Sequence, residues 1–320
     1  MHNVETMAYV NALPWHGLGQ RLALHEPIEV WMERAGMNWR IESAGVQFDT
    51  ADDDVQRREF SGQKVLYRSD TKAPLAIVSD RYQVVQPAEI LEFYRDLTDL
   101  GGFELETAGV LKDGKKFWAL ARTGQNVTLK GRDEVNGYLL LATGCDGTLA
   151  TTAQFTSVRV ICQNTLAIAL SKDAGAVKVP HRSQFDAQTV KRQLGVAIAS
   201  WDDFMMRMKA LSECRVNAKT TEAFLQRVLT YPATGASDHG TIAVNDRAVK
   251  VVHHLFTGRG MGSSFSSSAN TAWGLVNAVT EFVDHHRRAR SEDHRLDAAW
   301  FGQGADLKKK AWDEALALIS

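Results

Sequence analysis

Hydrophobic and polar positions alternate with a period of two along the first half of the chain and with a period near 3.6 along the second. Short alternating runs, broken by turn signals, extend to about Pro180, and long amphipathic runs such as Val190 to Leu211 follow. This change of period predicts an α+β fold with a mixed β-sheet half, residues 1–182, and a helical half, residues 183–320. The boundary is expected around residues 178–188.

The sheet half contains a clear hairpin signal. Asp113-Gly114 stands between two runs of β-type residues, which is the pattern of a tight hairpin turn. Further along, residues 136–143 are apolar at both alternating positions, which predicts a strand at the centre of the sheet. The charged segment 51–59 is predicted to be an exposed loop.

From Val158 the apolar positions switch to i, i+3 and i+4 spacing, which predicts a helix over residues 158–171. Arg159 and Gln163 would then lie one turn apart on its polar face. Together with the preceding strands, this helix gives residues 103–171 the order of a β-β-β-α core.

The composition of the 320-residue chain, 44% hydrophobic and 23% charged, allows a sizeable buried core. The formal net charge of -1 argues against a protein that coats duplex nucleic acid through positive charge alone. It is compatible with a local basic groove. No apolar run approaches the roughly 20 residues that span a bilayer, and no signal peptide is evident. We therefore expect a cytoplasmic protein without membrane contact, whose three cysteines are reduced.

Cations and aromatics gather around the predicted hairpin. Flat apolar surfaces stack on unpaired bases and mobile cations hold phosphates, so this combination is typical of proteins that bind single-stranded nucleic acid. A solvated hairpin tip whose lysines discourage edge pairing is the alternative. On the first interpretation the binding residues are Lys112, Lys115, Lys116, Trp118, Arg159, Gln163, Asn164 and Lys172.

A glycine- and serine-rich segment, residues 257–268, precedes a predicted helix that contains Trp273. It holds Gly258, Gly260 and Gly262 but lacks the ending of a Walker phosphate loop. A flexible linker or lid fits the pattern as well as an anion site at a helix N-terminus does. If the segment contacts DNA, Arg259 is the residue expected to lie against the backbone.

No catalytic or metal-binding pattern is complete. The pairs His253-His254 and His285-His286 are adjacent in sequence, so their side chains point about 100° apart on a helix and do not share a face. We therefore predict no catalytic residue, no metal and no cofactor. A metal-dependent nuclease that uses Asp284 and nearby histidines is retained as the third hypothesis.

Three motifs carry a family resemblance: PWHGLG at Pro14–Gly19, FTSVRVICQNTL at Phe155–Leu166, and NTAWGLVNAVTEFVDHHR at Asn270–Arg287 with AWFGQGADLKKKAW at Ala299–Trp312. They resemble the phage/plasmid-like protein family catalogued as domain of unknown function 932. The resemblance implies a setting in phages, prophages and plasmids of bacteria. The expected core at 103–171 is also similar, at the level of fold, to phage single-strand annealing proteins of the recombination-mediator type.

Two functions are therefore expected, in order. The first is non-enzymatic, ATP-independent binding and annealing of single-stranded DNA in phage or plasmid recombination, by a homo-oligomer that forms a ring or filament. The second is an anti-defence or plasmid-regulatory protein that acts through a protein partner of the host.

Overall fold

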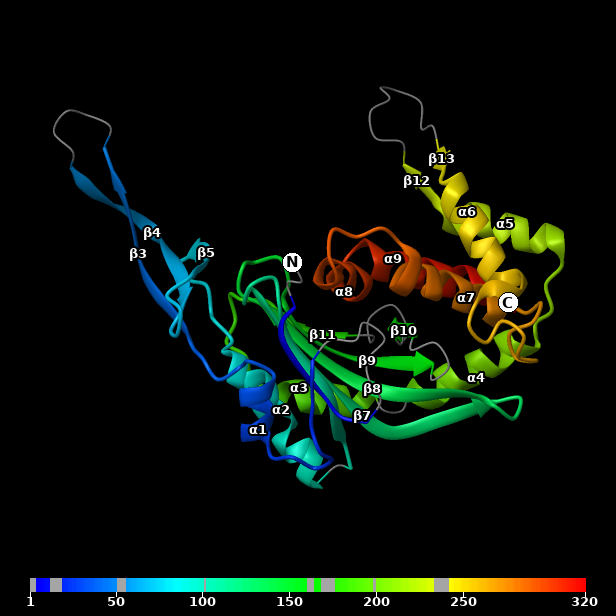
Figure 1. The fold of residues 1–320 in the computed structure, drawn as a ribbon, viewed down its shortest axis with the longest axis horizontal. Coiled ribbons are helices and arrows are strands. Elements are labelled where there is room, and N and C mark those ends of the chain that lie inside the picture. The colour runs from blue at the N-terminus through cyan, green and yellow to red at the C-terminus, as the bar shows by residue number, and fades with distance from the viewer. Residues whose placement is uncertain are drawn as a thin grey trace.

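The computed structural model describes residues 4–11, 19–50, 56–100, 102–159, 164–167, 176–197, 200–232 and 242–320. A large, strongly twisted β-sheet forms the body, and helices lie on both of its faces (Figure 1). The α+β class is confirmed, with a mixed sheet in the first half of the chain and most of the helices in the second.

The large sheet has the strand order β10-β9-β8-β7-β6-β1-β2, and β11 pairs with β9. All its neighbouring strands are antiparallel except β1 and β2. β8 lies in the interior of the sheet, between β7 and β9, as its apolar sequence predicted, and Asp113-Gly114 connects the hairpin β6–β7. The strands are β1 (Val4–Tyr9), β2 (Gln20–Arg21), β6 (Glu104–Leu111), β7 (Lys116–Leu129), β8 (Asp133–Gly144), β9 (Thr151–Arg159), β10 (Asn164–Ala167) and β11 (Ala176–Val179).

The two faces of this sheet bury different side chains. Phe117 and its alternating neighbours belong to the larger core cluster, to which α1 (Ile28–Arg34) and α2 (Pro87–Leu100) contribute. Trp118 belongs to a smaller cluster on the opposite face, under α8 (Glu292–Phe301). Phe117 and Trp118 are successive residues of β7, and successive residues of a strand point to opposite faces of the sheet. β7 therefore contributes side chains to both clusters.

The second half of the chain is helical, as predicted, and adds to the larger core through residues such as Trp201 and Phe204. The predicted amphipathic run corresponds to two helices, α3 and α4, with residues 198–199 outside the described part. A short strand pair and two π-helical turns, η1 and η2, of which η1 is kinked at Gly258, complete this half. Its elements are α3 (Ala187–Ala197), α4 (Ser200–Glu213), α5 (Ala218–Val228), β12 (Thr230–Pro232), β13 (Ile242–Val244), α6 (Asp246–His254), η1 (Leu255–Arg259), α7 (Ala272–Glu281), η2 (Phe282–His286), α8 (Glu292–Phe301) and α9 (Gln303–Leu316).

The predicted helix over residues 158–171 is wrong in its described part. Strand β9 continues through Arg159, and residues 164–167 form β10, which pairs antiparallel with β9. Gln163 lies outside the described residues. The backbone groups of β10 form hydrogen bonds with β9 instead of hydrogen bonds within a helix. The β-β-β-α order expected for residues 103–171 is therefore replaced, in the described part, by further strands.

A second sheet projects from the body as an arm (Figure 1). It consists of β3 (Ile41–Asp49), β4 (Arg57–Arg68) and β5 (Pro74–Ser79), in the order β3-β4-β5. Residues 57–59, expected in a loop, belong to β4. The root of the arm packs on the body through Leu66 and Ile41, both buried. No helix within the described ranges is long and apolar enough to cross a membrane.

Candidate functional site

The hairpin lysines predicted to hold phosphates turn inward. Lys116 is 4% exposed, and its ammonium group pairs with the carboxylate of Asp297 on α8. Lys112 pairs with the same carboxylate at 2.5 Å. Lys115 is half-buried and has no ion pair among the described residues. The structure thus corrects the placement of two of the three lysines, because α8 covers the hairpin and supplies the carboxylate that binds them.

The aromatic residue expected to stack on bases is also interior. Trp118 is 2% exposed, and its ring meets that of Trp300 edge to face, with 4.9 Å between the centroids. Its placement on a nucleic-acid surface is therefore corrected as well: the ring is part of the contact between sheet and α8.

The Asp297 carboxylate gives this contact a dependence on pH. Burial raises its pKa, but hydrogen bonds from Lys112 and Lys116 outweigh that effect and hold the pKa below its ordinary value. A carboxylate whose pKa is lower in the folded state stabilises the fold above its unfolded pKa, and this stabilisation is lost as the pH falls through the folded pKa.

We therefore expect Asp297→Asn to be less stable than the wild type at about pH 7, with the difference shrinking as the pH falls below about 5. Urea unfolding at a series of pH values measures this. A constant difference across the series would contradict the assignment of the effect to Asp297.

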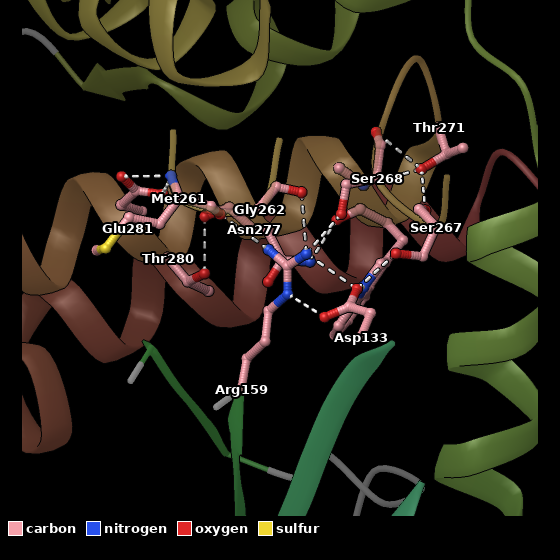
Figure 2. Close-up of polar contacts among 12 residues, drawn as sticks. Asp133, Arg159, Met261, Gly262, Ser267, Ser268, Thr271, Asn277, Thr280 and Glu281 are labelled. Atoms are coloured by element: carbon pink, nitrogen blue, oxygen red, sulfur yellow. Dashed lines mark hydrogen bonds and ion pairs between the residues drawn. The ribbon is translucent and has the colours of Figure 1, made fainter. Parts of the chain in front are cut away.

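Arg159 lies at the end of β9 and is buried with Asp133 at the start of β8. The guanidinium donates to the carboxylate from Nε at 2.6 Å and from Nη2 at 2.9 Å, as Figure 2 shows. Asp133 also accepts from the Ser267 hydroxyl at 2.6 Å and from the Trp273 indole at 3.1 Å. We call this set, Asp133, Arg159, Ser267, Ser268 and Trp273, the latch.

The latch fixes the glycine- and serine-rich segment to the end of the sheet. Arg159 donates to the Ser268 hydroxyl at 2.7 Å and to the carbonyl oxygens of Met261 and Gly262, each at 3.3 Å (Figure 2). A buried guanidinium bound on so many sides holds its partners in one geometry. The segment is therefore a fixed loop rather than a flexible linker, and we call residues 257–271 the latch loop.

Close packing holds the far end of the latch loop. A Cβ atom on Gly274, in the first turn of α7, would lie 2.0 Å from the backbone oxygen of Ser268. Only glycine fits this approach. Thr271 caps α7 by accepting from the backbone N–H of Gly274 at 3.1 Å, so the loop ends where the helix begins.

A buried carboxylate closes the other end of the latch loop. Glu281 is buried on α7, and both its oxygens accept from the backbone N–H of Met261, at 3.0 and 3.2 Å. Burial raises the pKa of this carboxyl, and the hydrogen bond from Met261 and the nearby His286 reduce that shift. The first residues after η1 are thus held as firmly as the last.

Cations and one aromatic ring occur on and beside the latch loop. Arg259, at the end of η1, is exposed and has no carboxylate partner among the described residues. The guanidinium of Arg132, in the turn between β7 and β8, lies 4.3 Å from the ring centroid of the half-buried Phe265. Lys130 in the same turn donates to the carbonyl oxygens of Ser212 and Ser266, so the turn is tied to the loop.

The predicted binding residues therefore do not form one surface. Arg159 and Arg259 converge on the latch loop, the first buried beneath it and the second exposed on it. Asn164 is in β10, at the edge of the large sheet. Gln163 and Lys172 lie outside the described residues.

His253, His254 and Asp284, considered above for a metal site, lie in different parts of the structure. His253 and His254 are exposed at the end of α6. Asp284 is buried and accepts from the ammonium group of Lys308 at 2.9 Å. In the described part of the chain, no three His, Cys, Asp or Glu residues are arranged to hold a metal ion.

Sequence reasoning missed several residues of this site, namely Asp133, Phe265, Ser267 and Ser268. Asp133 follows a turn and precedes an apolar strand, where an acidic residue is ordinary. Nothing local distinguishes it, because its partners are 26 and 134 residues away.

Comparison with known proteins agrees with the family resemblance described above. The family described as Domain of unknown function (DUF932) matches residues 74–300, which is more than half of the chain. No curated protein and no solved structure matches the chain. The matched region contains the whole latch and the latch loop, and the chain belongs to the DUF932 family.

Proposed function

We propose that this protein binds single-stranded DNA without catalysis or ATP and promotes annealing in phage or plasmid recombination, in the cytoplasm of a bacterial host. The contact surface is the latch loop with the turn between β7 and β8, in place of the hairpin lysines. The proposal is carried by one observation: a loop held by a buried ion pair bears both Phe265, over which Arg132 lies, and the exposed Arg259, which has no carboxylate partner in the described part of the chain.

A rigid latch loop favours binding because the loop is already ordered in the free protein. A preorganised surface loses less conformational entropy when a ligand binds. Cations on such a surface attract phosphates, and the Arg132–Phe265 pair offers a flat surface of the kind on which unpaired bases stack.

The charge of this surface is modest. The adjoining helix α6 adds exposed Arg247 and Lys250, while Glu134 is exposed next to Asp133. A modestly basic surface agrees with the net charge of -1. It predicts binding that is measurable at low salt and weakens steeply as salt is added.

The double variant Arg132→Ala/Arg259→Ala tests the surface. Each phosphate contact to a single strand contributes about 0.7 to the slope of log affinity against log salt, so the slope should fall by about 1.4 if each arginine holds one phosphate. Fluorescence anisotropy of a labelled oligonucleotide at several salt concentrations gives the slope. Quenching between labelled complementary strands measures annealing.

The matched control is Lys309→Ala/Lys310→Ala, which removes two exposed cations from α9. This control should bind as the wild type does. Equal loss in both double variants, or no binding by the wild type at low salt, would refute the proposed surface.

One observation favours the second candidate, a regulatory or anti-defence protein that acts through a host protein. The arm exposes Phe48, Phe60 and Ile77, and exposed apolar patches mark protein contacts. Recovery of a host protein in fixed stoichiometry, together with no retention of DNA, would favour this candidate.

A further inference from the structure

The arm carries an apolar face that the described remainder of the chain leaves uncovered. Ala44 lies opposite Val65, which lies opposite Ile77, and Val46 lies opposite Phe60. Residues directly opposite in a ladder share a face. The register on β4 shifts between Gly45 and Val46, but Ala44, Val46 and Phe48 alternate along β3, so these side chains form one stripe. Phe48, Phe60 and Ile77 are 47%, 48% and 60% exposed.

Strand β3 also has an open edge. Among the described strands, it pairs only with β4, on one side. At the root of the arm, the side-chain amide of Gln86 accepts from the N–H of Ile41 at 2.8 Å and donates to its carbonyl oxygen at 3.1 Å. One side chain thus replaces a neighbouring strand for a single residue.

Beyond Gln86, the edge has no partner among the described residues. Backbone groups alternate in direction along a strand, so those of Ser43, Gly45, Gln47 and Asp49 point outward as those of Ile41 do. The N–H of Thr50 donates to Gln56 across the hairpin, which confirms that the even-numbered residues point inward. Four successive outward positions therefore offer unpaired donors and acceptors.

The sequence of β3, IESAGVQFD, has little of the usual protection of an edge strand: its charges are two carboxylates, and the extra residues at the register shift near Gly45 belong to β4. Strand β3 contains no proline, no lysine and no arginine, and natural edge strands use such residues to prevent pairing with other chains. An edge with so little protection beside an apolar face is suited to pairing with another strand.

We propose that this strand is β3 of a second copy of the chain, paired antiparallel across a two-fold axis at Val46. In this register Ser43 pairs with Asp49 of the second copy and Gly45 with Gln47, and all four are outward-facing positions. Between them, Val46 meets Val46 of the second copy and Ala44 meets Phe48, so the apolar stripe continues across the axis.

The charges on β3 are compatible with self-pairing. Its only charged residues are Glu42 and Asp49. In this register Asp49 faces a serine and Glu42 faces Thr50, so no like charges stand opposite each other. Asp49 is also paired with Arg57 on its own hairpin at 3.2 Å. A two-fold contact closes on itself as a dimer, so the expected ring or filament would need a second surface.

Charge substitution at the axis tests this register. Val46→Lys and Val46→Glu each place two like charges opposite each other and should be monomeric, whereas an equimolar mixture should form a mixed dimer. Light scattering after gel filtration, without DNA, should give about twice 35.4 kDa for the wild type and for the mixture. Since the side chain of Val46 is on the exposed stripe, both variants should keep the circular dichroism of the wild type.

A second variant tests the backbone pairing itself. The N–H of Gln47 points outward, so Gln47→Pro removes a bond of the dimer and none within the hairpin, and this variant should be monomeric. Ile77→Lys is the control, because Ile77 lies on the same face but on β5, away from the axis; it should remain dimeric.

A monomeric wild type at the highest attainable concentration would overturn the proposal. So would dimers of either charged Val46 variant alone, or a different protein found in fixed stoichiometry on the arm.

Discussion

Replacing Asp133 by alanine is expected to lower the free energy of unfolding by about 3–5 kcal/mol. The substitution leaves the Arg159 guanidinium buried without its carboxylate, because the pair is only 3% and 0% exposed. It also removes the acceptor for Ser267 and Trp273. Urea unfolding followed by tryptophan fluorescence measures the loss.

An exposed ion pair gives the matched control. Arg57 and Asp49 lie 3.2 Å apart with most of each side chain in solvent, so Arg57→Ala should cost no more than about 1 kcal/mol. Arg159→Ala should resemble Asp133→Ala, and the double variant should cost clearly less than the sum of the two. Additive losses would show that the two residues do not act as a pair.

Replacing Lys308 by methionine is expected to cost about 3–5 kcal/mol as well. Methionine keeps much of the length and volume of lysine, so packing changes little, but the buried Asp284 carboxylate loses the ammonium group that lies 2.9 Å away. Urea unfolding again measures the effect. The additional change Asp284→Leu should restore a large part of the lost stability, since neither charge of this pair then remains.

The neighbouring residue supplies the control for this prediction. Lys309 is exposed and pairs with Asp313 one turn along α9 at 2.7 Å. Lys309→Met should change the free energy of unfolding by about 0.5 kcal/mol or less. Similar losses for the two lysine variants would mean that the cost arises from the helix and not from the buried pair.

The sequence predicted those parts of the fold that local pattern determines. Asp113-Gly114 specifies its hairpin because few residue pairs accept such a tight turn: Asp113 and Gly114 both have positive φ, 56° and 90°. The interior position of β8 followed from apolar side chains on both faces. Neither conclusion required knowledge of residues far away in the chain.

The error at residues 158–171 has a physical cause. Val158 and the apolar residues that follow recur at helical spacing, yet a strand buried on both faces also has apolar residues at many positions. Pairing of β9 with both β8 and β10 decided the outcome, and such pairing cannot be inferred from a single segment.

Strand β3 of the arm and the latch were missed for different reasons. The apolar residues of β3 are few and lie mostly in solvent, so its short alternation over residues 43–49 was not recognised as a strand. The latch joins side chains that are distant in sequence, and its members are individually ordinary. Lys112 and Lys116 were interpreted as a binding surface for the same reason. Their partner Asp297 lies 181 residues beyond Lys116, so the ion pair could not be inferred from the local sequence.

The latch also constrains the order of events during synthesis. Arg159 leaves the ribosome 109 residues before Ser268, and translation at about 5–20 residues per second makes that interval roughly 5–20 s. During this interval the strands can pair, but the guanidinium still faces water. The end of the sheet is therefore completed late, by a segment translated long after the strands that it joins.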